Sequence, residues 1–474
     1  TILCCHFVYK IKMKDGKVDR YKSRLVVDGS QQKSGIDYSE SFAPVIRYTT
    51  LRIFLAICAV HHMSVHQLDV ETAFIHAPLH EMVYVHPHPE MQVPKGHCIR
   101  LVKSLYGLKQ SPRNWNQHLH TFIVSLCFER CALDHCLYVG TLDSVPVFAA
   151  IFVDDILIAS SSDSVITKIK DSFKEKFTCS DMGLAREFLS IRITQSPGEI
   201  LIDQTQYVTS LLEKYSKYVG KRNYSDVPTV TDYIRRNIEP TSSTQHAFVD
   251  NFPYAEIVGS LLYVAVVTRL DIMYAVSVLT RHLKHPTYDA CKAACRVLNY
   301  LSNSRSKGIR YHGSKLCLHA YTDSDWGSDK DTRRSTSGTI VLMAGGPLNW
   351  MSKLQPIVAL SSMEAEYIAA FFAVQDIVWI LQLLRDIGLQ RSRPIPVHID
   401  NMSARQLAMN PVHHQRSKHI DIKYHWLRDQ VAASRVVLIH TDTTDQRADF
   451  LTKSVSGVTF HKHVNCVMVD IVVA

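Results

Sequence analysis

The chain has 474 residues, a formal net charge of +9, 46% hydrophobic residues and 20% charged residues. Single hydrophobic cores rarely grow beyond about 250 to 300 residues, so this length predicts two or three domains. The composition excludes a mainly disordered or collagen-like chain. The modest positive charge permits a polyanionic partner without requiring one. We expect no membrane span, because no run approaches about 18 apolar residues.

The twelve cysteines include no CxxC pair with the spacing of a zinc finger. Reduced cysteines that pack in the interior are therefore favoured over a structural zinc site. Reduced thiols are typical of proteins in an intracellular compartment.

The N-terminal segment from Phe7 to Val27 alternates apolar and polar residues on both sides of Asp15-Gly16. That dipeptide is favoured in tight turns, so the segment predicts a β-hairpin. One face is apolar, and the other is basic and includes Lys22 and Arg24 on the returning strand. Two interpretations remain open for the basic face, a solvated edge or a lid that grips phosphates.

Helical and strand patterns then alternate along the chain. Helices are predicted at about 51–60, 113–126, 165–176 and 207–215, with mostly helical sequence over 254–301. Strands are predicted at about 65–76, 145–160, 188–195 and 200–206, and a strand-rich block begins near Ile309. The segment from Tyr218 to Pro253 is polar and rich in Ser, Thr, Asn and Pro, which predicts a linker.

Asp154 and Asp155 are adjacent carboxylates inside an apolar hairpin, where they repel each other unless cations neutralise them. The pair alone also fits a simple turn, because Asp is a common turn former. Asp69 likewise interrupts a strand, where a charge without a partner is unfavourable. Three such acids could hold two divalent cations of the kind that promote phosphoryl transfer.

A second group of acids lies after residue 308. Asp323 interrupts a strand, Asp400 ends the apolar strand IPVHID, and Asp449 begins a predicted helix. Glu364 closes a predicted capping box at a helix N-terminus, so we assign it a structural role. Glu366 is then the acid of this helix that is left for chemistry.

The first half of the chain closely resembles copia-type reverse transcriptase in four segments of matching order and spacing, RYKSRLVVDGSQQKSGIDYSESFAPV, HQLDVETAFIHAPLHEMVYV, SLYGLKQSPRNW and FVDD. The second half resembles the ribonuclease H motifs of the same retrotransposon Pol polyproteins in YTDSDW, SSMEAEY, HIDNMSA and QRADFLTK. The resemblance extends from about Phe7 to Lys453.

This resemblance implies an α+β right-hand polymerase with fingers, palm and thumb, followed by an α/β ribonuclease H-like domain. The expected domains are 1–217 for fingers and palm, 218–308 for thumb and connection with a linker-rich start, 309–455 for ribonuclease H, and 456–474 for a C-terminal tail.

The resemblance also implies which residues act. Seven acids match catalytic metal ligands, three in the polymerase site and four in the ribonuclease H site: Asp69, Asp154, Asp155, Asp323, Glu366, Asp400 and Asp449. Six residues match positions that bind the nucleotide or template: Lys22, Arg24, Phe74, Tyr106, Gly107 and Gln110. Phe74 is implied as a steric gate against a ribose 2′-hydroxyl, with core packing as the alternative.

The implied function is RNA-directed DNA polymerisation with ribonuclease H activity, by two-metal phosphoryl transfer in both sites. Mg²⁺ is the expected cofactor, with Mn²⁺ as the alternative. The expected partners are RNA template, DNA primer, RNA–DNA hybrid and dNTPs, without a membrane, and with protease and integrase once joined in the same polyprotein. The expected location is intracellular, in a cytoplasmic virus-like particle, with later nuclear entry.

Two rival functions fit parts of the sequence. A decayed or domesticated remnant that binds nucleic acid without catalysis is disfavoured because all seven acids are present. A DNA-templated polymerase with an unrelated nuclease is disfavoured because no separate proofreading-type segment is recognisable. A zinc site is also disfavoured for the histidines of PVHHQRSKHIDIKYH, because structural zinc usually recruits cysteine. We expect Arg416, Lys418 and His419 to contact phosphates instead.

Overall fold

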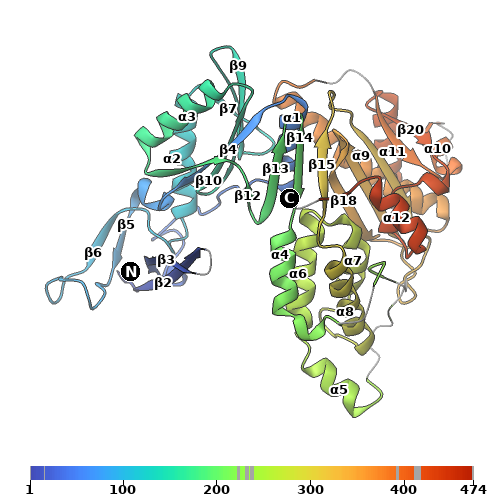
Figure 1. Ribbon diagram of the computed structural model, residues 1–474, viewed down its shortest axis with the longest axis horizontal. Helices are drawn as coiled ribbons and strands as arrows, with labels where there is room; N and C mark the ends of the chain where they lie inside the picture. The colour runs from blue at the N-terminus through green and yellow to red at the C-terminus, as the bar shows by residue number, and fades with distance from the viewer. Residues whose placement is uncertain are drawn as a thin grey trace. The chain divides into compact units, whose positions relative to one another are not determined.

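The computed structural model describes residues 2–14, 17–220, 225–229, 234, 240–390, 394–409 and 418–471. The chain divides into two compact units, Thr1–Thr50 with Ser64–Ala185, and Leu51–Met63 with Arg186–Ala474 (Figure 1). Residues 186–217, grouped by sequence with the first domain, therefore pack with the second unit.

The first unit is built on a six-stranded antiparallel sheet. Its strands follow the order β11-β4-β10-β9-β8-β7, with bounds Cys179–Leu184, Ser64–Val70, Asp155–Ser160, Val145–Phe152, Leu137–Leu142 and Phe128–Arg130. Helices α2 (Ser111–Ser125) and α3 (Asp163–Lys176) cover one face, where Phe122 packs edge-on to Phe173 with ring centroids 5.0 Å apart. The apolar residues of β9 and β10 are buried because these strands lie at the centre of the sheet.

Two smaller sheets complete the first unit. The predicted hairpin is confirmed by strands β2 (Cys5–Lys14) and β3 (Lys17–Val27), although its turn lies outside the described residues. Val27 N–H at the end of β3 donates to the Tyr106 carbonyl at 2.8 Å, which ties the hairpin to the loop before α2. The other sheet has the order β1-β5-β6, with bounds Ile2–Leu3, Pro78–Val85 and Ile99–Lys103.

The second unit contains a five-stranded antiparallel sheet of order β12-β13-β14-β15-β21. Its bounds are Glu187–Phe188, Ile191–Ser196, Glu199–Asp203, Lys307–His312 and Val469–Asp470. Helix α1 (Tyr48–Val60) joins this unit from Leu51 onward, and Arg52 donates to the Leu348 carbonyl at 2.6 Å. The expected C-terminal tail is ordered over α12 (Gly457–Asn465) and β21, which pairs with β15.

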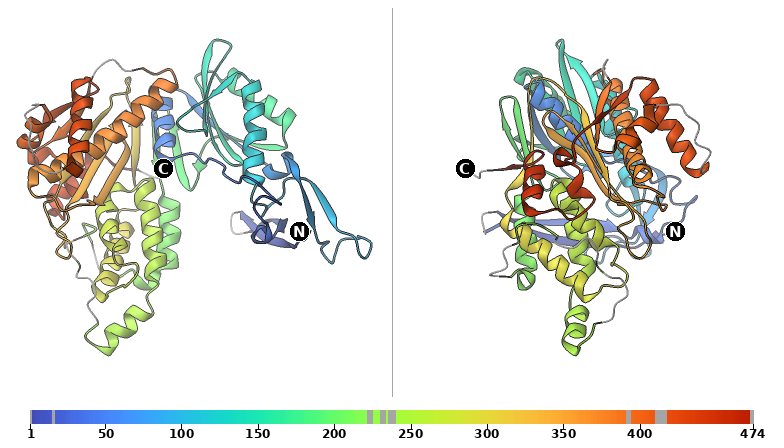
Figure 2. Two further views of the ribbon diagram at one scale, coloured as in Figure 1. Left: turned by 180° about the vertical axis from the view of Figure 1, so that it is seen from behind. Right: turned by 90° about the vertical axis from the view of Figure 1, so that its right-hand side faces the viewer.

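A group of helices extends from this unit, coloured green to yellow in Figure 2. Its members are α4 (Thr205–Lys214), α5 (Ser243–Asp250), α6 (Tyr254–Val267), α7 (Met273–Thr280) and α8 (Tyr288–Asn303). Helix α5 lies within the predicted linker, of which 221–224, 230–233 and 235–239 lie outside the described residues. The mainly helical segment predicted between Tyr254 and Leu301 is confirmed.

The C-terminal half of the unit is a mixed sheet of order β18-β17-β16-β19-β20. Its bounds are Gly346–Leu354, Thr336–Met343, His319–Ser324, Ile395–Ile399 and Val436–His440. The first three strands pair antiparallel, whereas β16, β19 and β20 pair parallel. Helix α9 (Ser362–Asp386) packs on β16 and β17, with α10 (Met402–Met409) and α11 (Lys418–Ala432) beside it. The predicted α/β arrangement is present.

Helix α9 corrects one expectation. By length and composition alone it could cross a membrane, with a mean hydropathy of 1.8 over its most apolar 18 residues. The expectation of no such run was wrong. The physical reason is that α9 is a core helix, in contact with the sheet on one side and with α10 and α11 elsewhere, so apolar residues are needed around much of its surface.

Candidate active sites

The first acid set is held by strand pairing in the first unit. Asp69 on β4 and Asp155 at the start of β10 are direct partners in the antiparallel pair, so their side chains share one face of the sheet. Asp154 lies in the preceding turn, where Val153 has a φ of +57°. Two hydrogen bonds fix this turn, from Val70 N–H to the Asp154 carbonyl at 2.9 Å and from the Trp115 indole to the Val153 carbonyl at 2.8 Å.

Basic side chains partly offset the charge of this acid set. Burial raises the pKa of Asp154, and the nearby carboxylate of Asp69 raises this pKa further, while Lys22 and Arg24 oppose the shift. The Asp155 carboxylate accepts a hydrogen bond from Gln67 Nε2 at 3.2 Å. Two mutually repelling carboxylates at a half-buried position favour a bound cation.

Predicted nucleotide-binding side chains gather near these acids. The Arg24 guanidinium lies 5.3 Å from the centroid of the Tyr106 ring, and the Phe74 and Tyr106 rings are 4.9 Å apart. Burial raises the pKa of Tyr106, and the acids of this set contribute to the same shift. Phe74 is half-buried in a short 3-10 helix after β4, so it is not the strand residue expected under the core-packing alternative.

Gly107 and Gln110 shape the loop that carries Tyr106. Gly107 has a φ of +92°, and a Cβ there would lie 1.9 Å from the Val27 carbonyl, so only glycine permits this approach to β3. Gln110 is fully buried; its Nε2 donates to the Asp37 carbonyl at 2.9 Å and its Oε1 accepts from Gln32 at 3.0 Å. The structure thus places Gln110 inside the fold and does not bring it to the predicted nucleotide contact, because its polar groups are satisfied internally.

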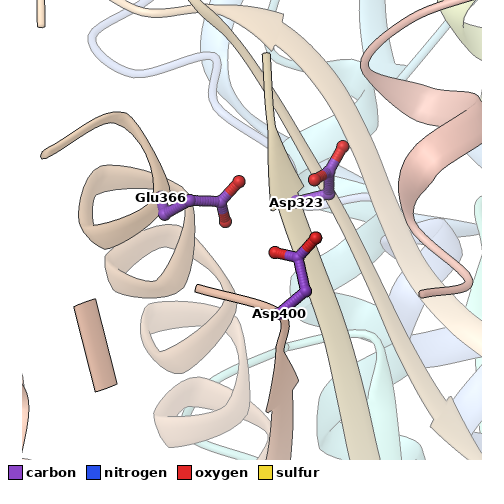
Figure 3. A group of neighbouring side chains, drawn as sticks. All are labelled: Asp323, Glu366 and Asp400. Atoms are coloured by element: carbon purple, nitrogen blue, oxygen red, sulfur yellow. The ribbon is translucent and has the colours of Figure 1, made fainter. Parts of the chain in front are cut away.

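The second acid set converges from three elements of the second unit (Figure 3). Asp323 lies on β16, Glu366 on the second turn of α9, and Asp400 directly after β19. The parallel pairing of Tyr321 with His398 brings the ends of β16 and β19 together. One carboxylate oxygen from each acid lies within 4.8 Å of the others, the one such group among the described residues.

Asp449 lies near Asp323 and is linked to it through Lys453. It begins a short 3-10 helix (Asp449–Leu451), and its Oδ2 lies 3.3 Å from the Lys453 ammonium, which is 3.7 Å from Asp323 Oδ2. Thr452 Oγ1 donates a hydrogen bond to Asp323. Lys453 was not among the predicted site residues. Its position four residues after Asp449 is the spacing that indicates an ion pair between the two.

The second set holds more negative charge than the described residues neutralise. Burial raises the pKa of Glu366 well above its ordinary value, and Asp323 and Asp400 add to this. Burial and Asp323 also raise the pKa of Asp400, and they raise the pKa of Asp449 to about 7 against the effect of Lys453.

The donor atoms of the second set fit a hard divalent cation. Glu366 Oε2 and Asp449 Oδ1 are buried and receive no hydrogen bond from any described residue. Converging carboxylates of this kind are the ligands that Mg²⁺ and similar ions prefer. Glu366 Oε1, in contrast, accepts from Ser324 N–H at 2.9 Å, which orients the carboxylate.

Two further predictions concern Glu364 and the histidine-rich segment after residue 410. Ser361 Oγ accepts from Glu364 N–H at 3.2 Å and Glu364 Oε2 accepts from Leu360 N–H at 2.7 Å, so the structural role of Glu364 is confirmed. His413, His414 and Arg416 lie outside the described residues, as do the side chains of Lys418 and His419.

Comparison with known proteins covers both halves of the chain. The family model described as reverse transcriptase (RNA-dependent DNA polymerase) matches residues 2–230. The retrovirus-related Pol polyprotein from transposon TNT 1-94 of Nicotiana tabacum is 36% identical over 463 residues, which cover 96% of this chain and 34% of that protein. A transposon Ty5-1 protein of Saccharomyces cerevisiae is 33% identical, over 65% of this chain and 100% of that protein.

Among solved structures, a foamy viral protease–reverse transcriptase in complex with RNA/DNA hybrid matches with a TM-score of 0.43 at 12% identity, over 89% of this chain and 49% of that chain. The present chain spans about a third of the length of the plant Pol polyproteins that it matches, which are 34% and 31% covered.

Proposed function

Because this chain belongs to the family of copia-type retrotransposon Pol polyproteins, we propose that it joins an RNA-directed DNA polymerase to a ribonuclease that cuts the RNA strand of RNA–DNA hybrids. The observation that carries the proposal is the presence of two separate acid sets. One lies beside basic and aromatic side chains in the first unit, and the other is buried in the second.

In this proposal, the basic hairpin β2–β3 belongs to the fingers and the six-stranded sheet forms the palm. Helices α6 to α8 supply the thumb and connection, and the mixed sheet with α9 forms the ribonuclease H domain. The position of Asp69 and Asp155 on neighbouring strands supports the palm assignment. The mixed sheet order and the placement of Asp323 on its central strand support the ribonuclease H assignment.

In the polymerase site, Asp69, Asp154 and Asp155 would hold two Mg²⁺ ions, with Mn²⁺ as the alternative. When bound, such ions supply activation of the primer 3′-hydroxyl and charge neutralisation on the leaving pyrophosphate. Lys22 and Arg24 bind the triphosphate oxygens, since both act electrostatically on Asp154 and therefore lie close to the acids. Phe74 packs beneath the sugar and is held there by Tyr106.

In the ribonuclease site, Asp323, Glu366, Asp400 and Asp449 would hold the cations, which supply an activated water and stabilise the leaving oxygen. The chain's own groups keep these acids in place. Ser324 N–H orients Glu366, Thr443 Oγ1 donates to Asp400 at 3.2 Å, and Lys453 balances Asp323 and Asp449.

The partners proposed for this chain are an RNA template, a DNA primer, dNTPs and the RNA–DNA hybrid that polymerisation leaves behind. Protease and integrase parts of the same polyprotein are proposed as former neighbours in the sequence. We further propose an intracellular location in a cytoplasmic virus-like particle, with nuclear entry after DNA synthesis.

The test is primer extension and hybrid cleavage by the purified chain. A DNA primer on an RNA template should be extended with dNTPs and Mg²⁺, and the RNA of a labelled RNA–DNA hybrid should be cut. Both activities should stop when a chelator removes Mg²⁺ and return when Mg²⁺ is restored. A chain that binds the hybrid yet shows neither activity with Mg²⁺ or Mn²⁺ would establish the non-catalytic remnant instead.

A further inference from the structure

An exposed tryptophan lies next to the buried acid set of the second unit. The Trp326 side chain is 60% exposed, and its indole Nε1 donates to the Ala359 carbonyl at 3.1 Å. The hydrogen bond holds the ring in one place, on the loop between β16 and β17. A single exposed apolar side chain is common, whereas a contiguous exposed apolar patch is typical of a contact surface.

Two further apolar side chains extend this surface. Val358 and Leu360 flank Ala359 and are 46% and 78% exposed. Together with Trp326 they form what we call the Trp326 patch. Leu360 N–H donates to the Glu364 carboxylate, so the patch is anchored to the first turn of α9.

The patch is attached to two of the three elements that carry the converging acids, β16 and α9. Trp326 follows Asp323 by three residues, a distance that extended chain spans in at most about 10 Å. Ser324, between them, donates its N–H to Glu366 on α9. A nucleic acid bound at the acids therefore passes within reach of the Trp326 ring.

The charges of the same loop are arranged for a polyanion. The carboxylates of Asp325 and Asp329 accept hydrogen bonds from the backbone: Asp325 accepts from Thr336 N–H at 2.6 Å, and Asp329 accepts from Thr332 N–H at 2.9 Å. The other charged residues of this loop are three basic residues and one acid: Lys330, Arg333, Arg334 and Asp331. This excess of basic residues favours a negatively charged partner.

Arg333 lies beside Gly327. Its Nη2 is 3.6 Å from the position that a Cβ on Gly327 would occupy, and Gly327 directly follows Trp326. An exposed ring and an exposed guanidinium thus lie close together on one loop. Aromatic rings pack against nucleic acid and arginines pair with its phosphates, so the two side chains together suit a nucleic-acid strand.

We propose that the Trp326 patch, together with Arg333, binds the sugar–phosphate edge of an RNA–DNA hybrid whose RNA strand lies at the acid set. The inference rests on the proposed ribonuclease function and names a binding surface for its substrate. The ring packs against sugar faces and excludes water from the phosphates beside it, and Arg333 pairs with a phosphate. The Trp326 patch and Arg333 contribute to affinity for the hybrid, and the acids carry out the cleavage.

The experiment measures hybrid affinity on the full chain carrying Asp400→Asn, so that the RNA stays intact. Fluorescence anisotropy follows a labelled RNA–DNA hybrid in Mg²⁺. Trp326→Ala should weaken binding about tenfold, the usual order for a lost aromatic contact to nucleic acid. Trp326→Phe keeps an aromatic face but loses the indole N–H, and should remain within about threefold of the parent. Leu283→Ala, at another exposed apolar residue, should change nothing.

Arg333→Gln provides the second arm, because it removes the charge and keeps a long polar side chain. It should weaken binding and lower the slope of log Kd against log salt by about one, as expected for one lost phosphate contact. In the chain with Asp400 intact, Trp326→Ala should raise KM for hybrid cleavage while kcat stays close to its original value.

Several outcomes would overturn the inference. Unchanged affinity in Trp326→Ala would leave the patch without a role in hybrid binding, and it would then suit another protein surface. An equal loss in Trp326→Phe and Trp326→Ala would assign the effect to the hydrogen bond with Ala359. If the parent chain itself neither binds nor cuts the hybrid, the proposed ribonuclease function fails first, which is a different result.

Discussion

The two acid sets are built in different ways. Asp69, Asp154 and Asp155 come from two paired strands and one turn, and they remain half-buried beside Lys22 and Arg24. The second set draws one acid from each of four elements spread over residues 323–449, and Asp323, Glu366 and Asp449 are buried.

The two acid sets differ in what positions their side chains and in what offsets their charge. The first is positioned by strand register, and Lys22 and Arg24 partly offset its charge. The second is positioned by tertiary packing, and Lys453 is the cation that contacts it among the described residues. Buried repelling carboxylates are costly without counter-charges, so the second set should depend more strongly on its packing and on the cations proposed to bind there.

The largest expected effect tests the independence of the first set. Asp154→Asn should lower primer extension on the order of a thousandfold or more, because a lost carboxylate misplaces the cations while the side-chain volume is kept. Hybrid cleavage by the same variant is the control and should persist. Full extension by Asp154→Asn would remove this residue from the polymerase site.

Asp400→Asn is the reciprocal test in the second set. The rate of hybrid cleavage should fall roughly a hundredfold to a thousandfold or more, which corresponds to the loss of several kcal/mol of barrier lowering. Primer extension should change far less. One labelled RNA–DNA hybrid with a recessed primer reports both activities in parallel. Normal cleavage would contradict the role of Asp400, and joint loss of both activities would contradict two independent sites.

Phe74→Val sharpens the comparison within the first set, by testing the aromatic side chain beside the acids. The smaller side chain should open space for a ribose 2′-hydroxyl and raise ribonucleotide incorporation relative to deoxyribonucleotide by roughly tenfold or more. The measurement is the ratio of kcat/KM for the two nucleotides. An unchanged ratio would return Phe74 to a packing role against Tyr106.

Gly338→Ala tests whether the second set depends on packing. A Cβ at Gly338 would lie 2.6 Å from Thr452 Cγ2 and 2.9 Å from Leu451 Cβ, which pushes away the segment that carries Asp449. Overpacking of this kind costs about 1–3 kcal/mol. We expect a lower Tm for the second unit and reduced hybrid cleavage.

Gly259→Ala is the matched control for this variant. It lies on helix α6 with nothing within 4 Å of the added Cβ, so it should stabilise the helix by about 0.5–1 kcal/mol. If Gly338→Ala behaves like Gly259→Ala, the packing of Leu451 and Thr452 against β17 does not position Asp449.

Local sequence signals were sufficient for several elements. Alternation around a turn dipeptide predicted β2 and β3, and the Ser361 cap with Glu364 predicted the start of α9 and separated Glu364 from Glu366. These features depend on neighbours within a few residues, which a sequence displays directly. The roles of the seven acids came from family resemblance, and their catalytic function stays a prediction.

Other features depend on contacts between distant segments. The sequence does not display that helix α1 packs with the second unit from Leu51 onward, that β21 pairs with β15, or that Gln110 is buried against Gln32. Lys453 reaches Asp323 across 130 positions because Gly338 lets the Asp449 segment approach β17. By itself the sequence determined the local elements and supplied the acids. Only the tertiary structure decided which acids converge and what neutralises them, because convergence depends on packing between residues far apart in the chain.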